Sequence, residues 1–227
     1  MANVLLTGFE PFAGSPANAS WDAVSLLAET WTGPHELITR RIPVAFGSGG
    51  RRLTEHVAAH TPDVVVAVGV AEGRAVISPE RVAINFRDAR IPDNAGRQPI
   101  DVPVKPGGPP AYFSTLPVSA IVSALSVDGI PAAASLSAGT YVCNDAFYLL
   151  QHALVGLGVR SGFIHVPATV HMELDPAIPT MPVGEIARAL RIAIDTTIAG
   201  LRVGAPRHTR LAEESAAAPR ALAGQTT

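Results

Sequence analysis

An alternation of short apolar runs with segments of helical periodicity constrains the fold of this 227-residue chain more than any other feature. The clearest apolar run is Val64-Val65-Val66-Ala67-Val68-Gly69, in which β-branched residues dominate. Such a continuous run is typical of a central strand in a parallel sheet, because helices there cover both faces of the strand. The alternation therefore predicts an α/β sandwich with a mainly parallel sheet.

The remaining elements follow from the same two patterns, short apolar runs for strands and helical spacing of apolar residues for helices. Helical spacing of apolar residues predicts a first helix with Ser20 as its N-cap. The segment 87–110 is rich in Pro, Gly and Asp and is predicted to be a long ordered loop, a type of segment that often carries function. The predicted strands cover residues 3–7, 36–43, 131–137 and 160–166, with an extended segment over 75–86 that turns at Ser78-Pro79. The predicted helices cover residues 20–30, 47–60, 117–128, 141–157 and 183–200, and the loop covers 87–110.

Length and composition predict a simple domain organisation. We expect one α/β domain over residues 1–203, since a chain of this length can bury one good core. Residues 204–227, rich in Ala, Pro and Arg, are expected to form a disordered tail. Hydrophobic residues make up 48% of the chain and charged residues only 16%. This balance predicts that part of the apolar surface lies between the subunits of a homo-oligomer.

Charge and hydropathy exclude several classes of partner. The formal net charge of −2 argues against a nucleic-acid or anionic-membrane surface. No apolar run reaches the length of a membrane span, and the N-terminal residues indicate a first strand rather than a signal peptide. We expect the protein to be cytoplasmic, where a free thiol also persists.

The chain has one cysteine, Cys143, and it lies where a thiol can act as a nucleophile. A single cysteine excludes an intrachain disulfide and a cysteine-only metal site. The small-residue run before it ends at Gly139 and a helical pattern begins near Tyr141, so the sulfur is expected in the first turn of a helix. Backbone N–H groups there favour the thiolate. The alternative is a small buried hydrophobic residue without a chemical role.

Two other residues are candidates to act with the thiol. His165 ends an apolar strand, and sites in parallel sheets form where strands end, so Cys143 and His165 are expected at the same edge. His165 is the candidate base, and the alternative is a histidine of the core. Glu80 lies in an apolar stretch and is the candidate that orients the base. Its alternative role is a local salt bridge to Arg74 or Arg81.

Metal and phosphate sites receive little support from the sequence. His171 and Glu173 could join His165 around a metal, but their spacing matches no established zinc pattern. The glycine-rich residues 45–50 lack the Gly-Lys pair of a phosphate-binding loop. We therefore expect neither a metal nor a cofactor.

Six stretches of the chain, in this order, resemble the pyroglutamyl peptidase I family of cysteine peptidases, also called pyrrolidone-carboxylate peptidases. Each stretch alone is a modest signal, and six in the family's order are specific. They span the chain from its start to about residue 200. The stretches are Val-Leu-Leu-Thr-Gly-Phe-Glu-Pro-Phe-Ala-Gly from Val4, Pro-Glu-Arg-Val-Ala-Ile-Asn from Pro79, Ala-Arg-Ile-Pro-Asp-Asn from Ala89, Gly-Gly-Pro-Pro-Ala-Tyr-Phe-Ser-Thr-Leu-Pro from Gly107, Gly-Thr-Tyr-Val-Cys-Asn from Gly139, and Gly-Phe-Ile-His-Val-Pro from Gly162.

The resemblance implies a function and the residues that perform it. The implied activity is removal of an N-terminal pyroglutamyl residue from peptides through a thioester, by a triad of Cys143, His165 and Glu80. The resemblance also implies a three-layer α/β/α sandwich with a mainly parallel central sheet, of the phosphorylase/hydrolase-like type, that assembles as a homotetramer. Arg90 matches an arginine that helps to stabilise the oxyanion. The implied substrate-binding residues are Phe9, Phe12, Asn18, Tyr141 and Val142.

One segment departs from the family pattern. Pro167 is followed by Ala-Thr-Val-His-Met-Glu, where many members have Pro-Tyr-Ile-Pro-Glu-Gln. This departure motivates a second hypothesis, a catalytically silent protein on the same scaffold that binds pyroglutamyl or related small ligands. The intact Cys143, His165 and Glu80 argue against it.

Overall fold

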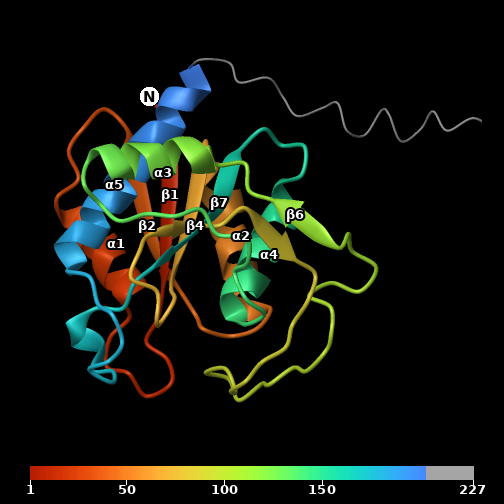
Figure 1. The fold of residues 1–227 in the computed structure, drawn as a ribbon. Coiled ribbons are helices and arrows are strands. Elements are labelled where there is room, and N and C mark those ends of the chain that lie inside the picture. Colours follow the sequence, from red (N-terminus) through yellow and green to blue (C-terminus); the bar gives the residue numbers. More distant parts are fainter. Residues whose placement is uncertain (203–227) are drawn as a thin grey trace, which may run out of the picture.

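A five-stranded sheet with the order β2-β1-β3-β7-β4 forms the centre of the computed structural model, which describes residues 1–202 (Figure 1). Four strands run parallel, and the short β4 pairs antiparallel with β7 at one edge. The mainly parallel sheet is thus confirmed. The strands are β1 (Asn3–Phe9), β2 (Glu36–Ile42), β3 (Val64–Val70), β4 (Ser78–Pro79) and β7 (Arg160–Val166).

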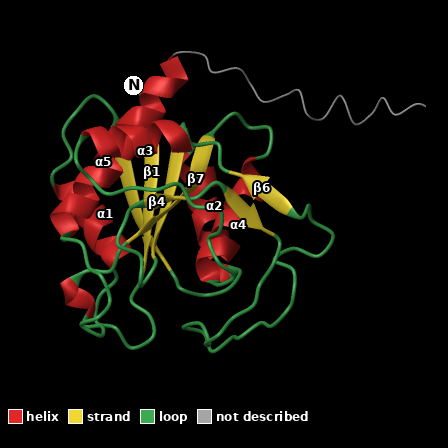
Figure 2. Cartoon of the chain, in the orientation of Figure 1, coloured by secondary structure: helices red, strands yellow, loops and turns green. Residues whose placement is uncertain are grey.

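Helices cover both faces of this sheet, so the three-layer sandwich is also confirmed (Figure 2). One face carries three helices that contact one another in the order α1, α5 and α3. The other face carries α2 and α4, which pack side by side. The helices are α1 (Ala19–Glu29), α2 (Ser48–His60), α3 (Val118–Val127), α4 (Val142–Leu154) and α5 (Val183–Arg202).

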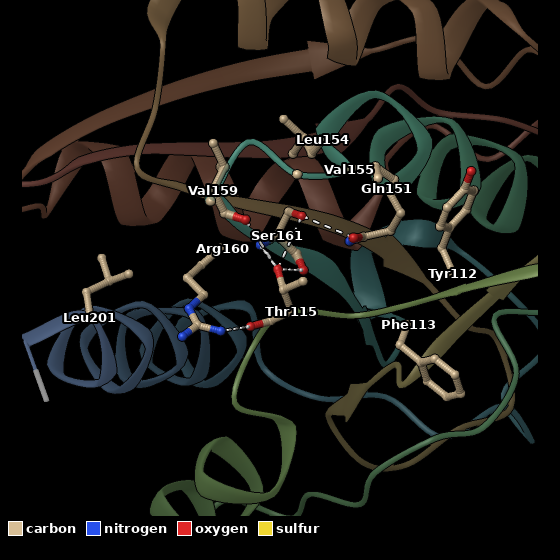
Figure 3. Close-up of a pocket in the computed structure, with 12 residues that line it drawn as sticks. Tyr112, Phe113, Thr115, Gln151, Leu154, Val155, Val159, Arg160, Ser161 and Leu201 are labelled. Carbon is tan, nitrogen blue, oxygen red and sulfur yellow. Dashed lines mark hydrogen bonds between the residues drawn. The ribbon is translucent and has the colours of Figure 1, made fainter. Parts of the chain in front are cut away.

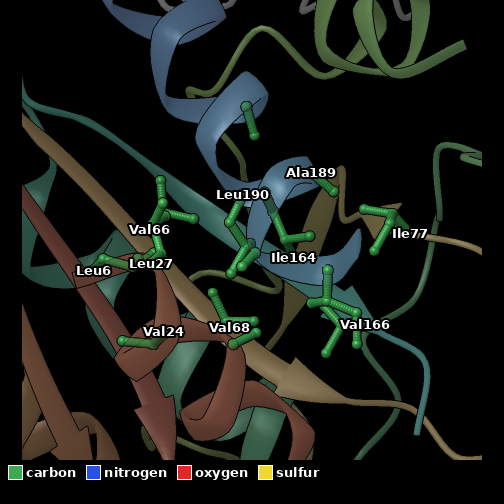
Figure 4. Close-up of a cluster of buried hydrophobic side chains, with 14 of the residues drawn as sticks. Leu6, Val24, Leu27, Val66, Val68, Ile77, Ile164, Val166, Ala189 and Leu190 are labelled. Carbon is green, nitrogen blue, oxygen red and sulfur yellow. The ribbon is translucent and has the colours of Figure 1, made fainter. Parts of the chain in front are cut away.

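The strand β3 divides the core into two clusters because its side chains alternate between faces. Val66 and Val68 pack with Leu190 of α5 on one side (Figure 4). Val65 and Ala67 join the other cluster, beneath α2 and α4. All four side chains are fully buried, and each buried valine stabilises the fold by about 1.5–3 kcal/mol.

The long loop predicted over residues 87–110 doubles back on itself. Arg87 and Val102 exchange backbone hydrogen bonds of 2.8 and 3.1 Å, and the Asp88 N–H donates to the Thr140 carbonyl just before α4. The loop joins a small antiparallel pair of strands, β5 (Val82–Ile84) and β6 (Ala111–Phe113). The strand β6 was not predicted.

Two local predictions differ from the structure. Residues 131–137 form no continuous strand; they pair with the segment around β4 only through bridges of Ile77 with Ala132 and of Glu80 with Ser135. Because β4 has only two residues, it cannot pair with residues 131–137 along their whole length. The N-cap of α1 is Asn18 and not Ser20, because the amide oxygen of Asn18 accepts the Ser20 N–H at 3.0 Å.

Other parts of the chain complete the description. A single 3₁₀ turn, η1 (Val170–Met172), follows β7. Within residues 1–202, no helix has the length and apolar character needed to cross a membrane. The predicted tail over residues 204–227 lies outside the described residues.

Candidate active site

The thiol of Cys143 lies in the first turn of α4, as the sequence predicted. The side chain is half-buried, and the N-cap residue Tyr141 makes no side-chain capping bond. The next residue, Asn144, anchors this turn: its amide accepts the Ile84 N–H and donates to the carbonyls of Ile84 and Phe86, all at 2.9–3.0 Å. The turn that carries the sulfur is therefore fixed to the β5 segment.

The sulfur lies against the end of β3, at Gly69. A Cβ atom at Gly69 would come within 2.9 Å of Cys143 Sγ and 2.8 Å of the Phe163 ring, so only glycine leaves room for the thiol. Gly69 pairs directly with His165 on β7. Paired residues of neighbouring strands direct their side chains to the same face, so the imidazole lies on the face where the sulfur rests.

The second candidate pair, His165 and Glu80, is joined by a short hydrogen bond. Nδ1 of His165 lies 2.7 Å from Oε1 of Glu80. The His165 side chain is nearly buried, and Glu80 is fully buried. The Glu80 N–H donates to the Phe163 carbonyl at 2.9 Å, which fixes the carboxylate beside β7. The carboxylate thus orients the ring and leaves Nε2 as the nitrogen free to exchange a proton.

The salt bridge that was the alternative for Glu80 is also present. Arg74 Nη1 donates to the same Oε1 at 2.9 Å. Arg81, the other partner considered, donates instead to the Ser119 hydroxyl. Glu80 therefore takes part in both the imidazole contact and an ion pair.

The protonation of the thiol differs from the expectation. Burial and the negative charge of Glu80 raise the pKa of Cys143 to about 12, although the charge of Arg74 lowers it in part. A group with this pKa is a thiol at neutral pH, whereas the position at a helix start led us to expect a thiolate.

The pKa values of His165 and Glu80 are also shifted. Burial lowers the pKa of His165, although the hydrogen bond and charge of Glu80 oppose this effect. Burial alone would raise the pKa of Glu80, but His165, Ser135 and Arg74 together hold it below the ordinary value. At neutral pH the site therefore pairs a carboxylate with a neutral imidazole, which can accept a proton from the thiol.

Aromatic rings gather beside the first turn of α4. The ring of Tyr141 lies 6.4 Å from Phe12 and 5.3 Å from Phe46, measured between centroids. The Tyr141 hydroxyl donates to the Pro92 carbonyl, which ties this cluster to the long loop. Phe46 was not among the predicted residues, because nothing in its local sequence distinguishes it from a core aromatic.

The other residues that the family resemblance implied, which include Arg90, lie outside this aromatic cluster. Phe9 is 2% exposed and packs against Phe163, and Val142 is fully buried. Asn18 uses both ends of its amide within the chain, to cap α1 and to bind the Glu10 carbonyl. Arg90 is exposed, and within residues 1–202 it makes no hydrogen bond or salt bridge that fixes its position.

Two cavities lie away from the thiol. One, of about 460 Å³, is at the opposite end of the sheet, between Phe113, Gln151 and Arg160 (Figure 3). The other, of about 410 Å³, lies between α2 and α4 and includes Phe46 and Arg87. Among residues 1–202, no three His, Cys, Asp or Glu side chains are grouped as metal ligands.

The contact between Gly69 and the sulfur leads to a prediction. Gly69→Ala is expected to lower kcat about 100-fold relative to the wild type, because its methyl group displaces Sγ from its position against β3. Gly184→Ala is the matched control, since a Cβ there meets nothing within 4 Å. Equal kcat values for the Gly69→Ala variant and the wild type, measured with a substrate amide, would contradict this placement of the thiol.

A cysteine at a helix start and an imidazole held by a carboxylate, at the same edge of a mainly parallel sheet, are typical of one class of protein: the cysteine hydrolases built on an α/β/α sandwich. The family model for pyroglutamyl peptidase matches residues 2–200. The chain therefore belongs to the pyroglutamyl peptidase family, a family of cysteine omega peptidases, as its motifs predicted.

Individual relatives agree with this assignment. The chain is 49% identical to pyrrolidone-carboxylate peptidase 1 of Ralstonia nicotianae, over 87% of this chain and 94% of that protein. It is 48% identical to the pyrrolidone-carboxylate peptidase of Clavibacter michiganensis, over 88% of this chain and 94% of that protein. The crystal structure of pyroglutamyl peptidase I from Bacillus amyloliquefaciens superposes with a TM-score of 0.83 at 42% identity, covering 88% of this chain and 98% of that one.

Proposed function

We propose that the protein is a cysteine exopeptidase that removes an N-terminal pyroglutamyl residue from peptides. The observation that carries the proposal is the 2.7 Å contact of His165 with Glu80, at the sheet edge where Cys143 rests against Gly69. This arrangement supplies a nucleophile, a base and a group that orients the base. Membership of the pyroglutamyl peptidase family supports the choice of substrate.

Proton transfer starts the reaction, because the resting nucleophile is a neutral thiol. Nε2 of His165 accepts the thiol proton as Sγ attacks the carbonyl carbon of the pyroglutamyl residue. The tetrahedral intermediate then collapses: the C–N bond breaks, and His165 returns the proton to the leaving amine. Glu80 stabilises the imidazolium formed between these steps.

The second half of the reaction releases the product. The first half leaves a thioester between Sγ and the pyroglutamyl carbonyl. His165 takes a proton from water, the hydroxide attacks the carbonyl, and the C–S bond breaks to release pyroglutamate. The sulfur then recovers its proton from His165. The Cys143 N–H and Arg90 are the proposed donors to the oxyanion in both halves.

The ring of the substrate requires flat apolar walls and amide partners rather than an ion pair, because it is neutral. The proposed walls are Phe9 and Phe12, with Tyr141 beside them. Val142 and Asn18, the other two proposed substrate-binding residues, are both buried.

A comparison of two aminoacyl amides tests the proposed substrate. The wild-type protein is expected to release a fluorophore from a pyroglutamyl amide at least about 1,000-fold faster, in kcat/KM, than from the matching prolyl amide. Proline has the same ring without the lactam carbonyl and carries a charged amine, which a site without a carboxylate anchor does not hold. Equal rates on both amides, or turnover of neither, would contradict the proposed function.

The silent binding protein is not favoured by these observations. All three triad residues are present, and both ends of the Glu80 contact are buried and aligned.

Homo-oligomer formation, as a tetramer, and a cytoplasmic location remain part of the proposal. The support for an oligomer is exposed apolar side chains, such as Phe113, Leu136 and Val170, each more than 70% exposed.

A further inference from the structure

Arg74 connects three segments of the chain around the candidate site. It lies in the turn after β3, beyond Gly69. Its Nη1 donates to Glu80 Oε1 at 2.9 Å and to the Ser135 hydroxyl at 3.4 Å, and its Nη2 donates to the Ser137 carbonyl at 3.1 Å. One guanidinium thus binds the carboxylate of the proposed triad and the segment that leads to α4.

Glu80 depends on these contacts because it is fully buried. Its Oε1 accepts from both His165 and Arg74, whereas its Oε2 has no hydrogen-bond partner among residues 1–202. A buried carboxylate with an unpartnered oxygen is costly unless a cation lies against it. Arg74 is the one permanently charged cation that the described residues place there.

We propose that Arg74 is a positioning residue of the active site, which holds Glu80 against His165 and balances the charge of the carboxylate. The proposal rests on the proposed function, since it assigns Arg74 to the same triad. In this role the ion pair has a chemical consequence beyond local stability. The positive charge of Arg74 reduces the effect of the Glu80 charge on the imidazole and on the thiol.

The sign of this effect follows from the groups that face the imidazole. These are Glu80 and Arg74, with Cys143 near both. The negative charge of Glu80 raises the pKa of His165 and of Cys143, and the positive charge of Arg74 lowers both. Without Arg74, His165 would keep its proton to a higher pH, and the thiol would ionise less readily.

Three Arg74 variants separate charge from contact. Arg74→Met removes the charge, Arg74→Gln removes the charge but keeps a donor that supports folding, and Arg74→Lys keeps the charge. In the two neutral variants the acidic limb of the kcat/KM profile, measured with a pyroglutamyl amide, is expected to move up by about 0.5–1 pH unit. KM is expected to stay within about twofold, and Arg74→Lys is expected to retain the wild-type limb.

Alkylation gives a readout that needs no turnover. Cys143 is the only cysteine, so its reaction with iodoacetamide is unambiguous. At pH 8 the neutral variants are expected to react about threefold to tenfold more slowly than the wild type, because less thiolate is present. Arg81→Met is the matched control, since Arg81 adjoins Glu80 in sequence but binds Ser119, and no change is expected.

The two measurements distinguish the failure of each proposal. A wild type that cleaves no pyroglutamyl amide would refute the proposed function, while alkylation would still report on Arg74. Unchanged limbs and unchanged alkylation rates in the neutral variants would overturn the role of Arg74. An equal loss of kcat in all three variants, without a shift of the acidic limb, would show that Arg74 only stabilises the local structure. That result would also overturn the proposed role.

Discussion

Replacement of Cys143 by alanine is expected to lower kcat/KM for a pyroglutamyl amide by at least about 10⁴-fold. The loss follows from the proposed thioester route, because no other thiol exists in the chain and the alanine side chain cannot attack a carbonyl. Cys143→Ser is expected to fall nearly as far, since a hydroxyl ionises even less readily than a thiol whose pKa is already about 12. The measurement is initial rates at saturating and limiting substrate.

The control for this result is binding and folding of the same variant. The Cys143 side chain is half-buried, and loss of its sulfur is expected to shift the melting temperature by only a few degrees. Pyroglutamate binding, measured by calorimetry, is expected to remain within about threefold of the wild type. A Cys143→Ala protein with more than a tenth of the wild-type rate would exclude the thioester mechanism.

Most of the fold was predictable because its elements carry strong local patterns. The β-branched run of β3 is typical of a buried strand, and the helical stripe of α5 needs an apolar partner. The elements that escaped prediction are short and depend on partners. The strand β6 is three residues long and exists through its pairing with β5. Residues 131–137, predicted as a strand, pair only through bridges with the two residues that flank the two-residue strand β4. Such pairings are tertiary and leave little trace in local sequence.

The position of the candidate residues at one edge of the sheet was predictable, but their electrostatics were not. Cys143 and His165 share an edge because parallel strands end together, and their motifs stand out in the sequence. The pKa of the thiol could not be predicted, since it is raised by burial and by the charge of Glu80, and both depend on the tertiary structure. The role of Arg74 was visible only as one of two possible partners of Glu80, and no local signal separates Arg74 from Arg81.

The space that Gly69 leaves for the sulfur is a further feature that the sequence did not reveal. Glycine at a strand end has many common causes, among them turns and bulges. Only the three-dimensional arrangement of α4 over β3 shows that this glycine is needed for the position of the thiol. Residues of this kind determine the geometry of a site without contributing a reactive atom.

His165→Asn is expected to lower kcat/KM for the pyroglutamyl amide by about 10³–10⁴-fold. An asparagine amide can still donate to Glu80, so the buried carboxylate keeps a partner, but the amide cannot accept the thiol proton. This substitution therefore separates the proton-transfer role of the imidazole from its structural role. Retention of the wild-type melting temperature, within a few degrees, would show that the loss is chemical.

The pH profile of the same variant identifies the group that titrates. Because burial lowers the pKa of His165, the wild type is expected to lose activity only as the pH falls below the ordinary range of histidine, where the imidazole becomes protonated and can no longer act as a base. In His165→Asn this limb is expected to disappear, and the residual rate is expected to rise steadily with pH as hydroxide replaces the base. His152→Asn should keep the limb, since His152 binds Tyr112 at the far end of α4. An acidic limb that survived in His165→Asn would assign the titration to another group and leave the thiol without its proposed base.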